Sequence, residues 1–306
     1  MRRELNVNSA HILYHRLRHL LKSSIPLHTD SDDCQPFFII GSGRCGSTLL
    51  RELLNQHPAL IIPPESYSIP SIYKKHRVYG TLPWKDYLSI ILGEFENHKE
   101  FYTWNLDLAQ YKQKLLELSP TDQSLRRVIK EIYEGYAMAN NKPTAYWGDK
   151  STVNTLYLDY LDRIFYAPKY IHIVRDGYDV VASFLDHKLL DTIEAAAMRW
   201  NSTVDYCTLY KKKTPSRIIE IRYEDLVKDP ATELNKICSF LKIKFYEGMA
   251  KSPKHAATGD LMHKHHQAVR NDISTTSIGR WQSYFTQEEK NRLYKLLSAN
   301  RKKYGY

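Results

Sequence analysis

The chain has 306 residues, of which 42% are hydrophobic and 25% charged, and its formal net charge is +10. This length suits one large α/β domain or two small ones, and no apolar run approaches the ~18 residues that a membrane span requires. The N-terminus has positive charge but no signal-peptide-like apolar stretch. Cys34, Cys45, Cys207 and Cys238 show neither metal-ligand spacing nor a dense disulfide framework, so we expect a protein of the reducing cytoplasm.

The excess of basic residues favours an anionic partner. Nucleic acid, acidic lipid, acidic glycan and polyphosphorylated nucleotide all fit, and solubility alone is the plain alternative. Charge does not choose among them, so the choice rests on motifs.

Residues 9–22 place apolar side chains at helical spacing, with arginines and histidines between them. The favoured placement of this helix is against the body of the domain, and peripheral contact with a membrane is the alternative. Residues 23–36 contain turn residues without periodicity and predict a loop. We therefore expect an N-terminal extension over residues 1–35 and a single domain over residues 36–306.

Short apolar segments predict buried strands at Phe37–Ile40, Leu60–Ile62, Tyr170–Val174 and Arg217–Tyr223. Apolar spacing predicts helices at residues 47–56, 84–92, 106–118, 124–138, 177–188, 192–211, 230–241 and 287–300. The tyrosine-rich stretch 66–145 is mostly helical in pattern and is interpreted as an insertion over the site. Strands that alternate with helices favour an α/β fold with a mainly parallel sheet.

The segment after the first strand, GSGRCGST, has features of a phosphate-binding loop. Gly41, Gly43 and Gly46 permit a tight turn whose backbone N–H groups face inward. Ser47 and Thr48 stand where the next helix begins, and the free N–H groups and dipole of a helix start favour an anion.

The glycine spacing matches that of nucleoside-triphosphate loops, but Ser47 stands where those loops have lysine. The cation has instead moved into the loop as Arg44. The sheet is therefore predicted to be P-loop-like. The residues predicted to bind the anion are Gly43, Arg44, Cys45, Gly46, Ser47 and Thr48.

A second strand–turn–helix segment, YIHIVRDGYDVVASFLDHK, has a charged turn. Arg175 stands at the strand end, and Ser183 lies about two helical turns beyond the helix start. A guanidinium fork recognises phosphate, and a serine hydroxyl can add a hydrogen bond. Asp176 is placed to cap the helix. The alternative makes Arg175 a structural ion-pair partner and Ser183 an ordinary helix residue.

Together these segments resemble the sulfotransferases that use 3′-phosphoadenosine 5′-phosphosulfate (PAPS), in their bacterial-type and tyrosylprotein-sulfotransferase-like branch. The resemblance covers most of the chain from residue 36 to residue 285. It implies that the first loop holds the 5′-phosphosulfate and that Arg175 and Ser183 hold the 3′-phosphate. It further implies PAPS as the donor, 3′-phosphoadenosine 5′-phosphate (PAP) as the product, and no metal.

Two further nucleotide contacts follow from the resemblance. Gly279 and Arg280, in the stretch GRW, resemble the late loop with which the family closes over the 3′-phosphate, although the motif is shorter than the Arg-Lys-Gly of cytosolic members. Tyr223, in RYEDL, falls where the family often has an adenine contact. A buried core role for Tyr223 is an equal alternative.

Ligands of parallel sheets gather at the carboxyl ends of the strands, which places Glu65 at the active edge. Sulfuryl transfer needs a base within reach of the acceptor hydroxyl. Glu65, in NQHPALIIPPESYSIP, resembles the glutamate of tyrosylprotein sulfotransferases and is the predicted base. Helix capping by Glu65 and catalysis by His57 are the alternatives.

Lys150, in WGDKST, resembles the lysine that the same enzymes place near the bridging oxygen of the donor. Its ammonium group would stabilise the departing nucleotide. Asp149 is expected to orient Lys150 or to cap the helix near Ser151. The predicted catalytic residues are thus Glu65, Lys150 and Arg44, and the predicted step is in-line attack of an acceptor oxygen on sulfur.

Two other functions compete with this prediction. A P-loop kinase needs a loop lysine, which is absent, and an acid for Mg²⁺, for which Asp176 is the candidate. A non-catalytic polyanion-binding protein leaves the two anion motifs unexplained. His263, His265 and His266 are interpreted as part of a loop near the nucleotide and not as a metal site. We expect a hydroxyl acceptor (carbohydrate, glycolipid, small metabolite or tyrosyl peptide) and no nucleic acid, and the oligomeric state stays open.

Overall fold

The computed structural model describes residues 24–29, 35–98, 100–142, 146–253 and 272–306. The predicted helix at residues 9–22 and the three histidines at 263, 265 and 266 lie outside these ranges. Within them, no helix is long and apolar enough to span a bilayer.

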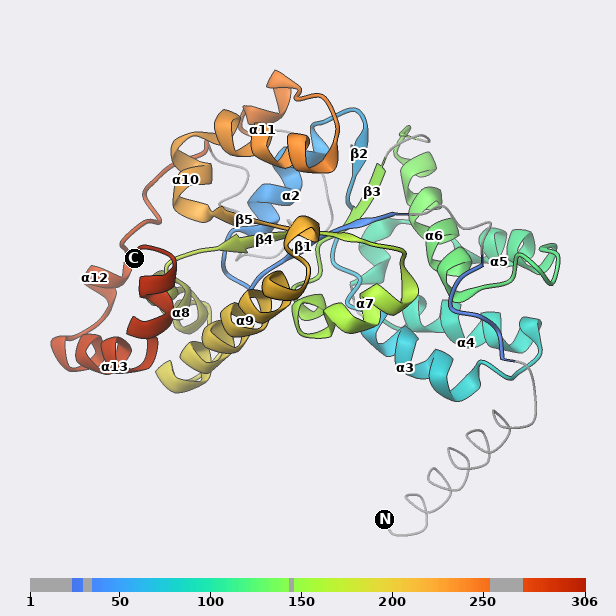
Figure 1. The fold of residues 1–306 in the computed structure, drawn as a ribbon, viewed down its shortest axis with the longest axis horizontal. Coiled ribbons are helices and arrows are strands. Elements are labelled where there is room, and N and C mark those ends of the chain that lie inside the picture. Colours follow the sequence, from blue (N-terminus) through green and yellow to red (C-terminus); the bar gives the residue numbers. More distant parts are fainter. Residues whose placement is uncertain (1–23, 30–34, 99, 143–145, 254–271) are drawn as a thin grey trace, which may run out of the picture.

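Five parallel strands form the central sheet, in the order β2-β3-β1-β4-β5 (Figure 1). The strands are β1 (Phe37–Ile40), β2 (Leu60–Ile61), β3 (Tyr146–Asp149), β4 (Lys169–Val174) and β5 (Ile218–Arg222). Phe37 of β1 is paired with Gly148 on one side and with Lys169 on the other. All four residues of β1 are buried, as expected for a parallel strand covered on both faces.

The sequence predicts four of these strands, and β3 is an addition. Its sequence, YWGD, contains glycine and aspartate, which are depleted in strands, and shows no clear alternation. The neighbouring strand explains the glycine, because a Cβ on Gly148 would lie 2.5 Å from the Phe37 ring. The segment becomes a strand because β1 and β2 pair with it, and not through local preference.

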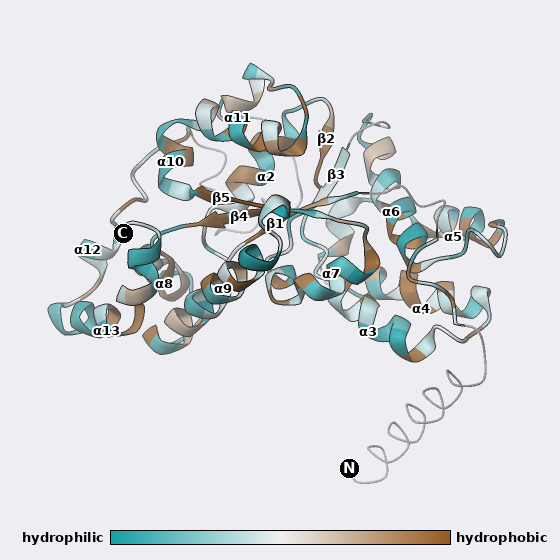
Figure 2. Cartoon of the chain, in the orientation of Figure 1, coloured by the Kyte–Doolittle hydropathy of each residue, from teal (hydrophilic) through white to brown (hydrophobic). Residues whose placement is uncertain are grey.

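Helices cover both faces of the sheet (Figure 1). On one face lie α2 (Ser47–Asn55), α10 (Tyr223–Lys228) and α11 (Pro230–Leu241), and on the other lie α7 (Leu158–Ile164), α8 (Gly177–Asp186) and α9 (Ile193–Lys213). The alternating side chains of β1 supply both cores, with Phe37 in one cluster and Phe38 in the other. The central strands are hydrophobic, whereas α9 and α13 (Gln287–Lys303) carry many hydrophilic residues (Figure 2).

The predicted insertion is helical, as expected. It contains α3 (Ile69–Tyr79), α4 (Trp84–Glu96), α5 (Leu108–Leu116) and α6 (Leu125–Ala139), with a short 3₁₀ helix η1 (Phe101–Trp104). These helices lie at the β2–β3 end of the molecule (Figure 1). Their apolar side chains share a core cluster with Phe38 and Trp147 of the sheet, so the insertion packs directly on the strands that carry the site.

The strand order of the sheet has its switch point between β1 and β4. After β1, α2 leads toward β2 at one edge, and after β4, α8 and α9 lead toward β5 at the other edge. Such a switch point, at the carboxyl ends of the strands, is where open parallel sheets bind ligands. The predicted anion-binding segments 41–48 and 175–183 follow these two strands.

Candidate active site

The loop between β1 and α2 turns through three residues with positive φ. Gly43, Arg44 and Gly46 have φ values of 80°, 56° and 94°. Because the left-handed region costs a residue with a side chain about 1–2 kcal/mol, the conformation of Arg44 indicates that the loop shape is imposed. Helix α2 begins at Ser47 with no side-chain cap, which leaves its dipole and N–H groups suited to an anion.

Tyr223, the first residue of α10, packs against the same loop. A Cβ on Gly46 would lie 2.3 Å from the Tyr223 ring, so only glycine allows this approach. Tyr223 is buried, and its ring lies 4.7 Å from the guanidinium carbon of Arg175. This tyrosine therefore connects the two predicted anion-binding segments.

Arg44, Arg175 and Ser183 meet at the switch point, as the sequence predicts. Arg44 Nε donates to Ser183 Oγ at 3.1 Å, and Arg175 Nη1 donates to the carbonyl oxygen of Arg44 at 3.3 Å. Burial first, and then the charge of Arg175, lower the pKa of Arg44. Two guanidinium groups held this close repel each other, and a bound anion would relieve the repulsion.

Arg175 itself retains unused hydrogen-bonding capacity. Its exposed fraction is 8%, and its Nη2 donates to the carbonyl oxygen of Ser277 at 2.5 Å. Its Nε is buried and has no hydrogen-bond partner among the described residues. A buried donor without an acceptor costs about 1–3 kcal/mol, so this group fits an anion such as phosphate.

The late loop, residues 277–281, contacts Arg175 and the residues around it. Ser277 Oγ lies 2.6 Å from the Tyr223 hydroxyl. The N–H groups of Gly279 and Trp281 both donate to the Asp179 carboxylate, at 2.7 and 3.0 Å. The sequence analysis does not identify Ser277 and Asp179 as site residues, because nothing in their local sequence marks them.

Arg280 takes a different position from the other predicted nucleotide contacts. Its guanidinium is exposed and pairs with Asp186, at the end of α8, at 3.2 Å. The backbone of Gly279 has φ 75° and is turned toward Asp179. The structure thus brings the backbone of the GRW motif to the site but places the Arg280 side chain on the surface.

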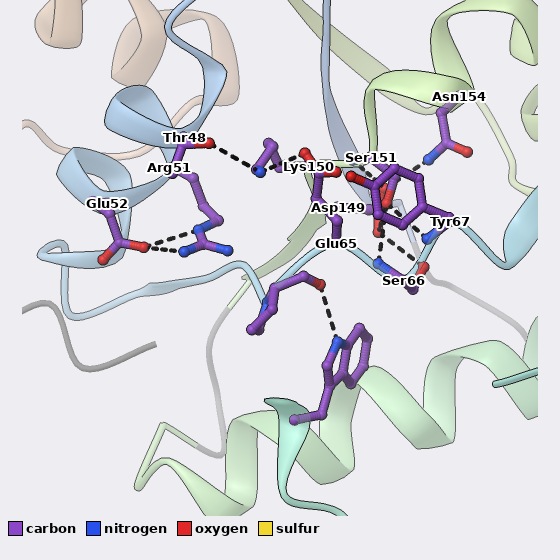
Figure 3. Close-up of polar contacts among 12 residues, drawn as sticks. Thr48, Arg51, Glu52, Glu65, Ser66, Tyr67, Asp149, Lys150, Ser151 and Asn154 are labelled. Atoms are coloured by element: carbon purple, nitrogen blue, oxygen red, sulfur yellow. Dashed lines mark hydrogen bonds and ion pairs between the residues drawn. The ribbon is translucent and has the colours of Figure 1, made fainter. Parts of the chain in front are cut away.

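Glu65 and Lys150 form an ion pair beside the loop between β1 and α2. Lys150 Nζ donates to Glu65 Oε1 at 2.5 Å and to Thr48 Oγ1 at 3.2 Å (Figure 3). Lys150 is fully buried and Glu65 is 7% exposed. Lys150 follows β3, so the strand that the sequence did not predict brings the lysine between α2 and the segment after β2.

Asp149 organises the backbone around this ion pair. Its carboxylate accepts hydrogen bonds from Tyr133 Oη at 2.6 Å, Asn154 Nδ2 at 2.6 Å and Ser151 N at 2.9 Å. Burial raises the pKa of Asp149 to about 6, although the hydrogen bonds from Tyr133 and Ser151 oppose the shift. Because Asp149 is held from three directions, the position of the adjacent Lys150 is fixed.

Ser151 links the two chain segments that carry the ion pair. Its Oγ donates to Asp149 and accepts from the backbone N–H groups of Ser66 and Tyr67, each at 3.2 Å (Figure 3). The segment that follows Glu65 is therefore bound to the segment that follows Asp149. Sequence reasoning missed Ser151 and Ser66, because their role depends on β3 lying beside β2.

His57, the alternative base, and Asp176, the candidate Mg²⁺ ligand, are both held by other parts of the chain. His57 Nδ1 accepts from Ala59 N at 3.0 Å, and its Nε2 lies 2.9 Å from the Lys244 carbonyl oxygen, so both ring nitrogens are bound by backbone. Asp176 caps α8 through Tyr178 N, as predicted, and receives both arms of the Arg301 guanidinium. In the described part of the chain, no group of three or more His, Cys, Asp or Glu side chains could hold a metal ion.

The fold and these contacts define the class of protein. The family model described as the Sulfotransferase family matches residues 36–247. The chain therefore belongs to the sulfotransferase family, which confirms the resemblance and the α/β fold predicted from the sequence. It is an enzyme that transfers a sulfuryl group to a hydroxyl acceptor.

Curated relatives have two different named activities. The chain is 27% identical over 259 residues to the omega-hydroxy-beta-dihydromenaquinone-9 sulfotransferase Stf3 of Mycobacterium tuberculosis, covering 69% of this chain and 64% of that protein. It is 25% identical over 276 residues to protein-tyrosine sulfotransferase A of Caenorhabditis elegans, covering 84% and 62%. The chain thus spans less than two thirds of the length of these two relatives.

Solved structures share the fold. The sulfotransferase domain from the Synechococcus PCC 7002 olefin synthase has a TM-score of 0.60 and 24% identity, with 89% of this chain and 98% of that chain covered. Mouse sulfotransferase SULT7A1 complexed with PAP has a TM-score of 0.50 and 15% identity, with 89% and 86% covered. These similarities concern the arrangement of the sheet and helices.

Proposed function

We propose that the sulfuryl donor is PAPS and that it binds across the carboxyl ends of β1 and β4. The observation that carries this proposal is the contact between the half-buried Arg44 and the buried Arg175, with Ser183 bonded to Arg44 and with the Arg175 Nε buried and without a partner among the described residues. One guanidinium lies at an open helix start and the other lies at the next strand end. Two separated anionic groups, as in a nucleotide with 5′ and 3′ substituents, match this layout.

The resemblance to PAPS-dependent enzymes assigns the two ends of the donor. Residues Gly43 to Thr48 would hold the 5′-phosphosulfate, and Arg175 and Ser183 would hold the 3′-phosphate. Tyr223 would contact the adenine side, since its ring already bridges the loop and Arg175. The SULT7A1 complex supports this assignment, because PAP is the product that such a donor leaves.

The proposed chemical step needs a base and a stabilised leaving group. Glu65 takes the proton from the acceptor hydroxyl, whose oxygen forms a bond to sulfur while the bond from sulfur to the bridging oxygen breaks. Lys150 and Thr48 are hydrogen-bonded to each other and lie at the loop that would hold the 5′ end, so they are placed to stabilise the departing phosphate. Glu65 is bonded to the same lysine, which places base and leaving-group stabiliser side by side.

The acceptor is proposed to approach Glu65 from the side opposite the nucleotide. It bears a hydroxyl, and the named relatives include one for protein tyrosine and one for a menaquinone derivative. We place the reaction in the cytoplasm, where the free, buried Cys45, Cys207 and Cys238 would remain reduced.

A calorimetric titration with PAP, ADP and ATP–Mg²⁺ tests the donor. We expect PAP to bind more tightly than ADP, and Arg175→Ala to weaken PAP binding by about 10- to 100-fold, because hydrogen bonds to charged groups contribute about 1.5–3 kcal/mol. Ser183→Ala should have a smaller effect in the same direction. Arg292→Ala, which removes an exposed arginine paired with Glu194, is the charge-matched control and should bind PAP normally. Tighter binding of ATP–Mg²⁺ than of PAP would contradict the proposal.

A further inference from the structure

The turn that carries Arg175 is held by side chains from distant parts of the chain. Trp200 Nε1 on α9 donates to the Arg175 carbonyl oxygen at 3.1 Å. Asp176 N donates to Glu224 Oε1 on α10 at 3.0 Å. The backbone on both sides of the Arg175 side chain is therefore fixed by partners outside β4 and α8.

Arg301, in the last turn of helix α13, also fixes the segment that carries Arg175. Arg301 donates to both oxygens of the Asp176 carboxylate, at 2.7 and 2.9 Å. Its guanidinium carbon lies 3.6 Å from the centre of the Tyr178 ring. A two-armed arginine–carboxylate pair that is also stacked on a ring fixes direction as well as distance. Arg301 thus fixes the residue next to Arg175.

Tyr306 holds Glu224, the residue that accepts the hydrogen bond from Asp176 N. Its hydroxyl donates to Glu224 Oε2 at 2.7 Å and lies 3.4 Å from the carbonyl oxygen of Val174. The Arg222 guanidinium carbon lies 4.5 Å from the centre of its ring. Burial, and then the neighbouring Glu224 carboxylate, raise the pKa of Tyr306, so the phenol keeps the proton that it donates.

We propose that the segment Arg301–Tyr306 positions the donor site, because Arg301 and Tyr306 fix the Asp176 and Glu224 side chains that orient Arg175 and Tyr223. This inference rests on the proposed function, in which Arg175 binds the 3′-phosphate. Arg301 and Tyr306 are positioning residues, since neither contacts Arg175 through its own side chain in the described contacts. The segment sets how well the enzyme distinguishes a nucleotide with a 3′-phosphate from one without it.

Tyr304 provides a matched comparison within the same segment. Its hydroxyl donates to Glu220 Oε1 at 2.8 Å, a bond of nearly the same length to the same kind of group. Glu220 lies within β5 and also receives His172 and Lys211, and it has no bond to the Arg175 turn in the described residues. Loss of either tyrosine hydroxyl should affect folding similarly, but only Tyr306 acts on the turn.

The experiment compares the affinities of Tyr306→Phe and Tyr304→Phe for PAP and for ADP by calorimetry. We expect Tyr306→Phe to weaken PAP binding by roughly three- to tenfold, in the range of couplings through packed side chains, and to leave ADP binding nearly unchanged. Tyr304→Phe should keep the wild-type preference for PAP. In turnover assays, Tyr306→Phe should raise KM for PAPS while leaving kcat and the acceptor KM close to wild type.

Arg301→Lys is the second variant, because it keeps the charge but loses the two-armed bond to Asp176. Lys303→Met, at an exposed ion pair with Asp205, is its control. Arg301→Lys should again reduce the preference for PAP, whereas Lys303→Met should not. If Tyr306→Phe and Arg301→Lys keep the wild-type preference, the inference is wrong while the donor assignment stands. If the wild type itself shows no preference for PAP over ADP, the proposed function fails and the inference fails with it.

Discussion

The two halves of the candidate site use charge in opposite ways. The donor half, formed by Arg44, Arg175 and Ser183, gathers positive charge and leaves one buried guanidinium N–H unpaired. The transfer half, formed by Glu65 and Lys150 with Asp149 beside them, pairs its charges internally and saturates its buried carboxylate. The donor half therefore keeps a buried guanidinium N–H, without a partner among the described residues, that an anionic ligand would satisfy. The transfer half is organised before any ligand binds, which is the condition under which fixed charges stabilise a transition state at little reorganisation cost.

This difference also decides how much of each half the sequence predicts. The donor half is read from two continuous segments, because Arg44 follows β1 and Arg175 and Ser183 share one turn and helix. The strand-end rule places Glu65 at the active edge, but its role as base and the choice of Lys150 come only from the resemblance, since the contact between the two residues depends on β3. That strand is paired with β1 and β2, and its Gly148 lies close against the Phe37 ring, a packing that single-residue preferences do not contain.

The helices show the same limit. Most of the longer helices are predicted, with ends that differ by a few residues, as in α4 and α6, whereas α3 is covered only by the general helical pattern of residues 66–145. The bounds Arg217–Tyr223 predicted for the last strand were too long, because α10 begins at Tyr223. The short helices α7 and α12 (Trp281–Tyr284) were not predicted, since one or two turns carry too little periodicity. The positions of Tyr133, Ser151 and Asn154 around Asp149 depend on three separate elements and have no local signal.

The strongest test of the comparison removes the proposed base from the transfer half. Glu65→Gln should lower kcat by about 10²- to 10⁴-fold, the range for loss of general-base catalysis, while PAP affinity stays within about twofold because the donor half is intact. Steady-state turnover and PAP calorimetry on the same preparation measure the two effects. Glu94→Gln, which alters a glutamate paired with Lys75 on α3, is the control. Retained turnover in Glu65→Gln would remove Glu65 from the mechanism.

Lys150→Met tests whether the internal pairing matters to the fold as well as to transfer. It leaves the buried Glu65 carboxylate without its cation, so we expect a loss of about 3–5 kcal/mol in the free energy of unfolding, together with lower turnover. Denaturant unfolding measures the first effect. The double variant Lys150→Met with Glu65→Leu should recover much of the stability and none of the turnover. A single variant as stable as the wild type would show that the ion pair is not essential to the fold.

Asp149→Asn tests the buried carboxylate through pH. The pKa of Asp149 is raised from 3.8 to about 6. The native state then keeps a proton that the unfolded chain has lost, so this group's contribution to stability falls as pH rises through that window. The free energy of unfolding of the wild type, relative to Asp149→Asn, should therefore fall by roughly 2 kcal/mol between about pH 4.5 and about pH 7.5. A difference that is constant, or that grows with pH, contradicts the assignment of this titration to Asp149.

The smallest effect is expected at Arg280, which the resemblance assigns to the donor half and the structure places on the surface. Its ion pair with Asp186 is exposed and contributes at most about 1 kcal/mol. Arg280→Ala should therefore change stability by less than about 0.5 kcal/mol and PAP affinity by less than about threefold. Calorimetry in parallel with Arg175→Ala makes the comparison direct. Equal losses in the two variants would mean that Arg280 turns toward the nucleotide when it binds.

The position of β1 in the middle of the sheet has a consequence for how the protein is made. Ile40 is paired with His172, about 130 residues later, and Phe37 is paired with Gly148. At a synthesis rate of ~5–20 residues per second, the nascent FFII segment waits about 7–26 s for its partners to be made. During that time four apolar side chains that end fully buried have no sheet to join. The strand that supports the loop between β1 and α2 is thus the first of the five to be translated, and it stays unpaired until β3 and β4 have been made.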